Sequence, residues 1–302
     1  MANKRIDEAT GTQTVGHEWD GIEELDTPMP RWWLVTFCIT IAFAVGYVIA
    51  YPAWPMIHEG TEGVLGWTSR GQLAGDMSKQ KAQFSQTVSL IATTPIEALP
   101  GDPARMRAAV AGGRAAFKVN CVQCHGAGAA GSKGYPNLSD DDWLWGGDIK
   151  AIEYTIIHGA RQPGDDKTRN SQMTAFGRDG ILTAAQIGQV AGHVLSLSGK
   201  ARDDAAGAHL FANNCAVCHG TDGRGNRMVG APNLADAIWL YGGSREDIEA
   251  QIANPHMGAM PAWGHRLDPV TIKMLAAYVH SLGGGEDFVE AVPAAAGTHA
   301  KP

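Results

Sequence analysis

The chain has 302 residues, 44% of them hydrophobic, with a formal net charge of −7 and a pI near 5.9. This length allows about two domains of ordinary size, and the apolar content excludes a disordered chain. The acidic balance argues against a nucleic-acid partner, which needs a basic face, and suits a basic protein partner instead.

An acidic N-terminal segment, residues 1–31, precedes a long apolar run. The run reads WWLVTFCITIAFAVGYVIAY from Trp32 to Tyr51, and no Asp, Glu, Lys or Arg occurs between Arg31 and Glu59. Twenty helical residues at about 1.5 Å each cover the roughly 30 Å hydrocarbon core of a bilayer. Aromatic rings at both ends suit the headgroup level. We therefore predict one transmembrane helix within residues 32–55, in contact with membrane lipid.

The alternatives for this run are a cleaved signal peptide and a buried core helix. The long acidic segment before it and the absence of an A-x-A site after it argue against a signal peptide. Lys4, Arg5 and Arg31 precede the helix, a weak bias toward a cytoplasmic N-terminus. The acidic residues of the segment are either a solvated charge run or partners for basic groups on another protein; they are Asp20, Glu23, Glu24 and Asp26.

Residues 56–103 and 287–302 have compositions typical of segments without a packed core. Residues 56–103 carry Gly and Pro punctuation and only weak helical periodicity around Lys79 to Ile91, which indicates a linker. Residues 287–302 are small, polar and Pro-containing, which indicates a disordered tail.

Between linker and tail the chain repeats one unit. Residues 104–200 contain NCVQCHG, YPNL, WLWGG and MTAFG, and residues 201–286 contain NCAVCHG, APNL, WLYGG and MPAWG in the same order. Phe117 matches Phe211, and Trp143 matches Trp239. Landmarks repeated in one order predict two domains of one fold.

Helix signals recur at equivalent places in the two repeats. Thr183 and Gln186 form a predicted capping box, Ser244 with Asp247 is a capping signature, and Asp268 is a predicted N-cap. Apolar residues at helical spacing follow each of these starts. The repeats are therefore predicted to be mainly α.

Each repeat contains one Cys-x-x-Cys-His motif, the attachment signature of c-type haem. Two thiols about one helical turn apart form thioethers to the porphyrin, and the histidine next to them lies under the iron. The motif residues are Cys121, Cys124 and His125 in the first repeat and Cys215, Cys218 and His219 in the second. The sequence predicts two covalently bound haem c groups with their iron.

Two other readings compete for these cysteines. A four-cysteine zinc site would use both Cys-x-x-Cys pairs, but zinc ribbons place their pairs close in sequence. A thioredoxin-like dithiol needs a strand before the motif and no fixed histidine after it. Both fit the spacing less well than haem.

The sixth iron ligand has candidates in both repeats. Aligning MTAFG with MPAWG pairs Met173 with Met260 and leaves Met257 out of register, and a thioether ligand closes the iron to exogenous ligands. Core filling is the alternative for any methionine. Histidines without a counterpart in the other repeat are weaker candidates: His158, His256 and His265. Those on the closing helices are expected in ordinary polar contacts: His193 and His280. Trp143 and Trp239 are expected to pack on or hydrogen-bond to the haem edge.

The run HEWDGIEELDTPMPRWWLVTFCITIAFAVGYVIAYPAWP, His17 to Pro55, followed by two Cys-x-x-Cys-His repeats, resembles the dihaem membrane-anchored subunit III of cbb3-type cytochrome c oxidase. The resemblance implies two tandem class I cytochrome c-like helical domains after one transmembrane helix. It implies that Met173 serves the haem of Cys121, Cys124 and His125. It likewise implies that Met260 serves the haem of Cys215, Cys218 and His219, and it leaves open an exchange of sulfur ligands between domains.

The same resemblance implies a role and a location. The subunit relays electrons from a donor cytochrome c through its haems toward the oxygen-reducing subunit, and it is not an enzyme by itself. Its implied partners are the catalytic haem-copper subunit and the monohaem cytochrome c subunit of a proton-pumping oxidase. The implied location is the bacterial inner membrane, with a single pass and periplasmic haem domains. The alternatives are a dihaem subunit of another respiratory complex, a dihaem peroxidase and a haem-based gas sensor.

Overall fold

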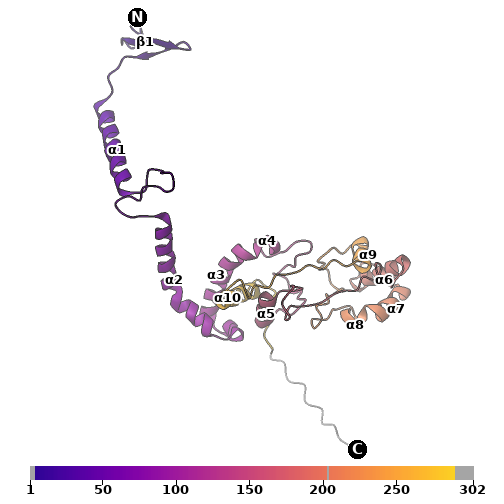
Figure 1. Cartoon of the computed structure of the whole chain (residues 1–302). Coiled ribbons are helices and arrows are strands. Elements are labelled where there is room, and N and C mark those ends of the chain that lie inside the picture. The colour runs from indigo at the N-terminus through magenta and orange to yellow at the C-terminus, as the bar shows by residue number, and fades with distance from the viewer. Residues whose placement is uncertain (1–3, 203, 290–302) are drawn as a thin grey trace, which may run out of the picture. The chain divides into compact units, whose positions relative to one another are not determined.

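The computed structural model describes residues 4–202 and 204–289, so most of the predicted tail at 287–302 lies outside the described residues. The chain divides into two compact units, Met1–Gln83 and Phe84–Pro302 (Figure 1). Each unit is considered by itself below.

A small β-hairpin occupies the N-terminal segment. Strand β1 (Thr14–Trp19) pairs antiparallel with β2 (Ile22–Leu25), with Trp19 opposite Ile22. The two turn residues, Asp20 and Gly21, have φ of +50° and +84°. Positive φ at both positions is the two-residue turn that Asp-Gly favours. The hairpin was not predicted, and this dipeptide was the signal for it.

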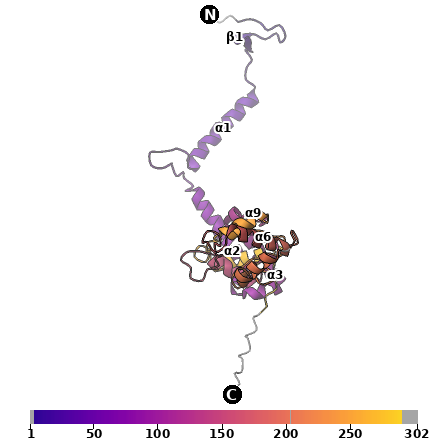
Figure 2. The ribbon, with the colours of Figure 1, turned by 90° about the vertical axis from the view of Figure 1, so that its right-hand side faces the viewer.

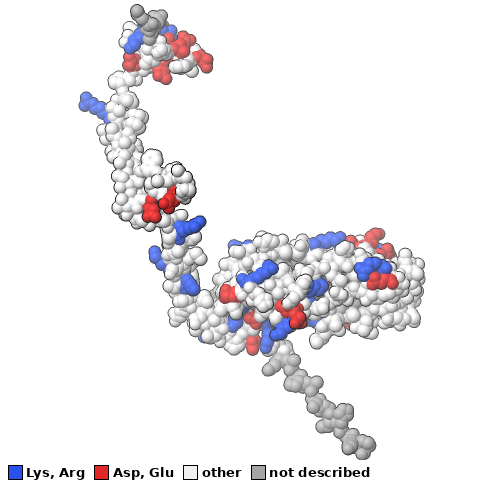
Figure 3. Space-filling model, in the orientation of Figure 1, with Lys and Arg blue, Asp and Glu red and all other residues white. Residues whose placement is uncertain are grey.

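Two acidic residues of this segment have partners within their own unit. Arg5 Nε lies 2.7 Å from Glu23 Oε2, and Lys4 Nζ lies 3.0 Å from Asp26 Oδ2. Both signs of charge are visible over the hairpin in Figure 3. Glu23 and Asp26 thus have basic partners within the chain, while the alternatives for this acidic segment, a solvated charge run or a docking partner, stay open.

Helix α1 (Arg31–Ala50) matches the predicted membrane span. It has 20 residues, none of them buried, and its surface beyond Arg31 is uncharged (Figure 3). Among the described residues it is the one helix long and apolar enough to cross a membrane. Full exposure of large apolar side chains, such as Phe43 at 72%, does not fit a core helix of a soluble domain. Pro52 follows the helix end at Tyr51.

The predicted linker contains a longer helix than its sequence pattern indicated. Helix α2 spans Ser69–Thr93, 25 residues, and the 3₁₀ helix η1 (Ile96–Gly101) follows. Polar residues of α2 interrupt its apolar residues, so the periodic apolar stripe that would have predicted the helix is weak. Its C-terminal end is capped by Lys273, whose Nζ donates to the carbonyls of Ile91, Ala92 and Thr94 at 3.2, 3.0 and 2.7 Å.

Eight α-helices lie between residues 103 and 280 of the described part of the second unit. In chain order they are α3 (Pro103–Asn120), α4 (Val122–His125), α5 (Ile149–His158), α6 (Ala184–Leu197), α7 (Ala205–Asn214), α8 (Ala216–His219), α9 (Arg245–Ala253) and α10 (Pro269–His280). The predicted starts at Thr183, Ser244 and Asp268 are confirmed, because each side chain caps its helix and Thr183 with Gln186 forms a full capping box.

These helices form two hydrophobic cores that do not follow the sequence repeats. The first core joins α3 and α5 of the first repeat to α10 of the second. The second core joins α7 and α9 of the second repeat to α6 of the first. Figure 1 shows α10 beside α3 and α5, and α6 beside α7 and α9; Figure 2 turns the view by 90°. The repeats have exchanged their closing helices.

Equivalent glycines allow the close helix crossings on which the exchange depends. A Cβ atom on Gly113 of α3 would overlap the backbone of Met274 in α10, and one on Gly207 of α7 would overlap the backbone of Gln189 in α6. The matched phenylalanines make tilted ring contacts at the same crossings. Phe117 lies 5.2 Å from Tyr278, and Phe211 lies 5.1 Å from His193, between ring centroids.

Two segments carry the chain from one core to the other. Residues 159–172 lead from α5 toward the second core, and residues 254–259 lead back from α9 toward the first. They meet in an antiparallel bridge, in which Ala160 N donates to Met260 O at 3.0 Å and Met260 N donates to Ala160 O at 2.9 Å. The crossing therefore fixes the position of Met260.

Candidate haem-binding sites

The first motif lies at a helix end that places two sulfurs and a histidine together. Asp102 caps α3 by accepting from the amides of Ala104 and Arg105, and α3 ends at Cys121. The single turn of α4 follows, in which His125 N donates to Cys121 O at 2.9 Å. Cys121 and His125 line one cavity, and Cys124 lies exposed in the same turn.

Hydrogen bonding orients the first histidine for a metal. His125 Nδ1 lies 3.1 Å from the carbonyl oxygen of Pro136. A carbonyl can only accept, so Nδ1 carries the proton and Nε2 keeps its lone pair. Burial lowers the pKa of His125, although the Pro136 bond opposes this. The imidazole is therefore neutral at neutral pH, the state that binds a metal.

The second motif repeats this construction. Asp204 caps α7, which ends at Cys215, and α8 carries the motif to His219. His219 Nδ1 lies 3.1 Å from Pro232 O, and burial lowers the pKa of His219. The histidine side chain is buried, with 8% of its surface exposed. Its Nε2 is thus free for the same role.

The first cysteine of each motif is a poor free nucleophile. Burial, followed by the neighbouring cysteine, raises the pKa of Cys121 to about 11, and the same causes raise that of Cys215 to about 11. A buried thiol resists ionisation because its thiolate loses hydration. A thioether has no proton to lose, so attachment to a porphyrin suits these positions.

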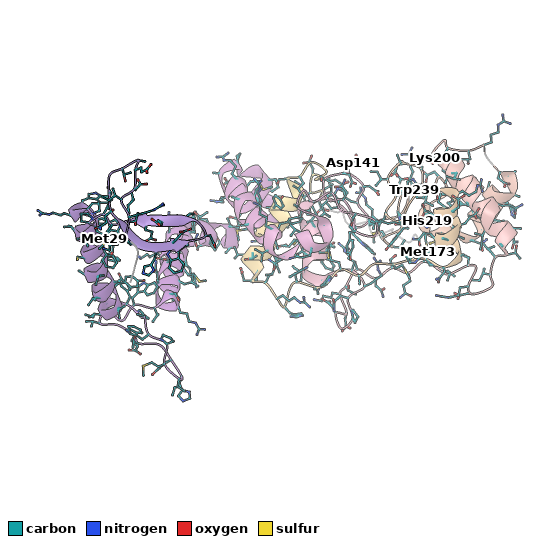
Figure 4. All side chains as sticks on the ribbon, turned by 90° about the horizontal axis from the view of Figure 1, so that it is seen from above. Met29, Asp141, Met173, Lys200, His219 and Trp239 are labelled. Atoms are coloured by element: carbon teal, nitrogen blue, oxygen red, sulfur yellow. The ribbon has the colours of Figure 1, made fainter. Side chains whose placement is uncertain are left out.

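The structure pairs the methionines differently from the sequence prediction. Met260 lines the same apolar cavity as Cys121 and His125. Met173 packs against the second core, which contains Cys215, and Figure 4 shows Met173 in the same region as His219. In this structure Met260 thus lies with the first motif and Met173 with the core of the second, which is the exchange of sulfur ligands that the resemblance left open.

Backbone hydrogen bonds explain the crossed pairing. Trp263 N and Gly264 N donate to Ile156 O and Ile157 O at the end of α5, both at 3.0 Å. Phe176 N donates to Ile252 O at the end of α9, at 3.1 Å. Each methionine segment is thus tied to the helix of the other repeat. Aligning the two repeats selected Met173 and Met260 as candidate ligands, but the sequence contained no signal that each lies with the motif of the other repeat.

The matched tryptophans lie in the two cores but differ in hydrogen bonding. Trp143 Nε1 donates to Gly284 O at 2.6 Å. Trp239 Nε1 is buried, and within the described part of the chain it has no hydrogen-bond partner. Lys200 Nζ lies 5.4 Å from the Trp239 ring centroid (Figure 4). A buried, unpaired N–H beside a cation fits an anionic group of a ligand.

Of the weaker histidine candidates, His158 and His256 are engaged elsewhere, and His280 makes a polar contact as expected. His158 Nδ1 lies 3.0 Å from Asp165 Oδ2, His256 Nδ1 lies 3.0 Å from Gln251 Oε1, and His280 Nε2 lies 2.8 Å from Glu286 O. The two Cys-x-x-Cys pairs lie in different cores, and no cluster of three or more His, Cys, Asp or Glu side chains among residues 4–202 and 204–289 is placed to hold a metal ion. A shared zinc site does not fit this arrangement.

The residues present fit a covalently attached haem. The first cavity is lined mainly by apolar and aromatic side chains; beside Cys121, His125 and Met260 these include Phe117, Leu138, Trp143, Trp145, Ile156, Trp263 and Leu275. The Cys121 thiol, the His125 imidazole and the Met260 thioether all line this cavity, and Cys124 lies one residue before His125. This donor set is the one that holds haem in c-type cytochromes.

Comparison with known proteins agrees with the fold. Residues 11–58 match the N-terminal domain of cytochrome oxidase-cbb3, FixP; residues 110–198 match cytochrome c; and residues 202–279 match subunit III of cbb3-type cytochrome c oxidase. A FixP subunit of Bradyrhizobium sp. is 50% identical over 94% of this chain and 99% of its own length. A CcoP subunit of Cereibacter sphaeroides is 51% identical over 90% of this chain and 95% of its own length.

The fold and the sites define a c-type cytochrome with an apolar N-terminal anchor helix and two tandem cytochrome c domains. Such domains imply covalently bound haem c. The chain belongs to the FixP/CcoP family, subunit III of the cbb3-type cytochrome c oxidases, and its function is electron transfer within that oxidase.

Proposed function

We propose that this chain binds two haem c groups with crossed axial ligands. Cys121 and Cys124 attach the first haem, with His125 and Met260 as axial ligands. Cys215 and Cys218 attach the second, with His219 and Met173 as axial ligands. The main support for this pairing of histidines with methionines is that His125 and Met260 line one apolar cavity. The packing of Met173 against the core that contains Cys215 supports it further.

We further propose that the chain relays electrons and performs no catalysis itself. Haem iron with imidazole on one face and thioether on the other supplies one-electron transfer and has no open position for oxygen. His125 and His219 hold the iron from one side through imidazoles whose tautomer is fixed by Pro136 and Pro232. The electrons pass from a donor cytochrome c toward the catalytic haem-copper subunit of a proton-pumping oxidase.

The proposed location follows from the anchor. Helix α1 spans the bacterial inner membrane once, the hairpin lies on the cytoplasmic side, and the haem-binding unit lies in the periplasm, where c-type haem is attached. The unburied apolar surface of α1 supports the span. The proposed neighbours are lipid around α1 and the catalytic and monohaem cytochrome c subunits of the oxidase.

Single-haem chains test the ligand pairing. Cys215→Ala with Cys218→Ala leaves one attachment motif, at Cys121. In that chain Met260→Ala is expected to abolish the sulfur-to-iron charge-transfer band, and Met173→Ala is expected to preserve it. The reciprocal chain, Cys121→Ala with Cys124→Ala, is expected to show the opposite dependence. A band lost with Met173→Ala in the first chain would contradict the crossed assignment.

Oxygen uptake by the purified complex tests the relay. Replacing His125 or His219 by Ala is expected to slow turnover with a cytochrome c donor. A small reductant that delivers electrons directly to the other subunits is expected to support uptake in both variants. Unchanged donor-driven uptake in both variants would contradict the relay.

A further inference from the structure

Trp145, in the WLWGG segment of the first repeat, contacts residues of both repeats. Its indole lines the cavity that contains His125 and Met260. The same ring lies against Gly230, where a Cβ atom would overlap it. Gly230 has φ of +61° and belongs to the loop that follows the second motif. Trp145 therefore connects the first cavity with the loop that follows the second motif.

A short path through the backbone and one hydrogen bond continues from that contact to the second histidine. Gly230 precedes Pro232 by two residues, and Pro232 O accepts from His219 Nδ1 at 3.1 Å. From the wall of the first cavity to the His219 ring, the path consists of the indole, one van der Waals contact, a three-residue backbone segment and one hydrogen bond. Electronic coupling falls much less steeply along bonds than across gaps.

A cation near the indole limits its freedom to move. The Arg169 guanidinium carbon lies 5.4 Å from the Trp145 ring centroid and 4.4 Å from that of Tyr154. Arg169 N also donates to Gly159 O at 3.0 Å. Trp145 thus has Arg169 and Gly230 as neighbours, and cation–π contacts of this kind favour one ring position.

We propose that Trp145 is the contact through which electrons pass between the two sites. The inference rests on the proposed binding of a haem at each motif. In each transfer one iron is oxidised and the other is reduced by the same electron. The indole is not itself oxidised, and no proton moves. Trp145 improves the coupling because it replaces a gap between the sites.

The equivalent residue of the second repeat, Tyr241, has a different role. A Cβ atom on Gly134 would lie 3.5 Å from Tyr241 Cε1, an ordinary contact rather than an overlap. The Tyr241 hydroxyl accepts from Gly258 N at 2.8 Å, two residues before Met260. Near Tyr241, Gly134 N also donates to Leu240 O at 2.8 Å, which offers a competing backbone route to His125 through Pro136.

The experiment separates the sites by their ligands. Met173→His in the full chain is expected to give the site of His219 two histidine ligands and a lower potential. The remaining sulfur-to-iron band then reports only the site of His125. The oxidised protein is then reduced by a pulse that supplies less than one electron per chain. The band bleaches when an electron reaches the site of His125. The phase of bleaching whose rate does not depend on protein concentration measures transfer from the second site to the first.

In this background, Trp145→Leu is expected to slow the intramolecular phase at least about tenfold, equivalent to about 1.4 kcal/mol in activation free energy. Trp145→Phe, which keeps an aromatic ring, is expected to slow it less. Val229→Ala, which alters the exposed neighbour of Gly230 in the same loop, is the control for loosening of this contact and is expected to leave the rate unchanged. Spectroelectrochemical titration of each variant checks that neither potential has moved.

The outcomes distinguish this inference from the proposed function. An unchanged rate in Trp145→Leu, with unchanged potentials, overturns the role of Trp145 and favours the backbone route through Leu240. Faster hydrogen exchange in residues 224–231 without a change in rate also overturns it, because Trp145 would then only pack. Complete loss of the sulfur band in Met173→His would instead show that Met260 is not a ligand and so contradict the proposed function.

Discussion

Tyr241→Phe removes a single hydrogen bond that holds the segment of Met260. The hydroxyl accepts from Gly258 N at 2.8 Å, while Met260 itself is bound to Ala160 through two backbone bonds of 2.9 and 3.0 Å. The aromatic ring and its contact with Gly134 remain in the phenylalanine variant. The perturbation is therefore confined to the approach of the Met260 sulfur.

A hydrogen bond between neutral groups contributes about 1 kcal/mol net. Loss of the Tyr241 bond is expected to raise the population with Met260 detached by roughly fivefold, since RT is about 0.59 kcal/mol. Exogenous imidazole binds only the detached state, so its apparent affinity at the site of His125 is expected to rise by the same factor. Spectral titration of the oxidised protein measures this affinity.

Two variants complete the design. Tyr154→Phe also removes one hydrogen bond, from the hydroxyl to Lys167 O at 2.9 Å, and is expected to leave imidazole binding at this site unchanged. Met260→Ala opens the same site fully and supplies its reference spectrum. If Tyr241→Phe leaves the affinity unchanged, or raises it at the site of His219 instead, the reasoning that Tyr241 clamps Met260 is refuted.

Three further expectations concern single substitutions. Burial, followed by the charges of Asp236, Asp140 and Asp141, raises the pKa of Asp142 from 3.8 to about 6, with Arg227 opposing. The folded state therefore binds more protons than the unfolded state between these values, so stability falls as pH rises through this window. Asp142→Asn is expected to raise the free energy of unfolding by about 1 kcal/mol at pH above 6, a value discounted for solvent screening of a half-buried group. It is expected to have no such effect near pH 4. Equal changes in thermal midpoint at both pH values would contradict this. Lys273→Met removes three bonds to the end of α2 and is expected to lower the opening free energy of residues 90–94 by about 2 kcal/mol; unchanged hydrogen-exchange protection there would argue against the cap. Met257, 42% exposed, is out of register with Met173, so Met257→Ala is expected to keep both sulfur bands, and loss of either one would show that it is a ligand.

Local chemistry determined much of this protein before any tertiary structure was known. The uncharged run after Arg31 predicted α1, because only an apolar helix of that length suits a bilayer. The capping residues Thr183, Ser244 and Asp268 predicted three helix starts, because a side-chain oxygen satisfies amides that the helix leaves free. The Cys-x-x-Cys-His spacing predicted the two attachment sites, since one helical turn fixes the geometry of all three side chains.

Tertiary structure decided which parts of the two repeats pack together. Helices α6 and α10 carry similar apolar patterns, and α3 and α7 offer them equivalent crossings at Gly113 and Gly207. A sequence repeat cannot distinguish packing within a repeat from packing between repeats, because both bury the same kinds of side chain. The crossing bridge between Ala160 and Met260 selects the exchanged arrangement. Helix ends and motifs depend on neighbours a few residues away, whereas the choice of sulfur for each histidine depends on contacts about a hundred residues apart, which local patterns do not encode.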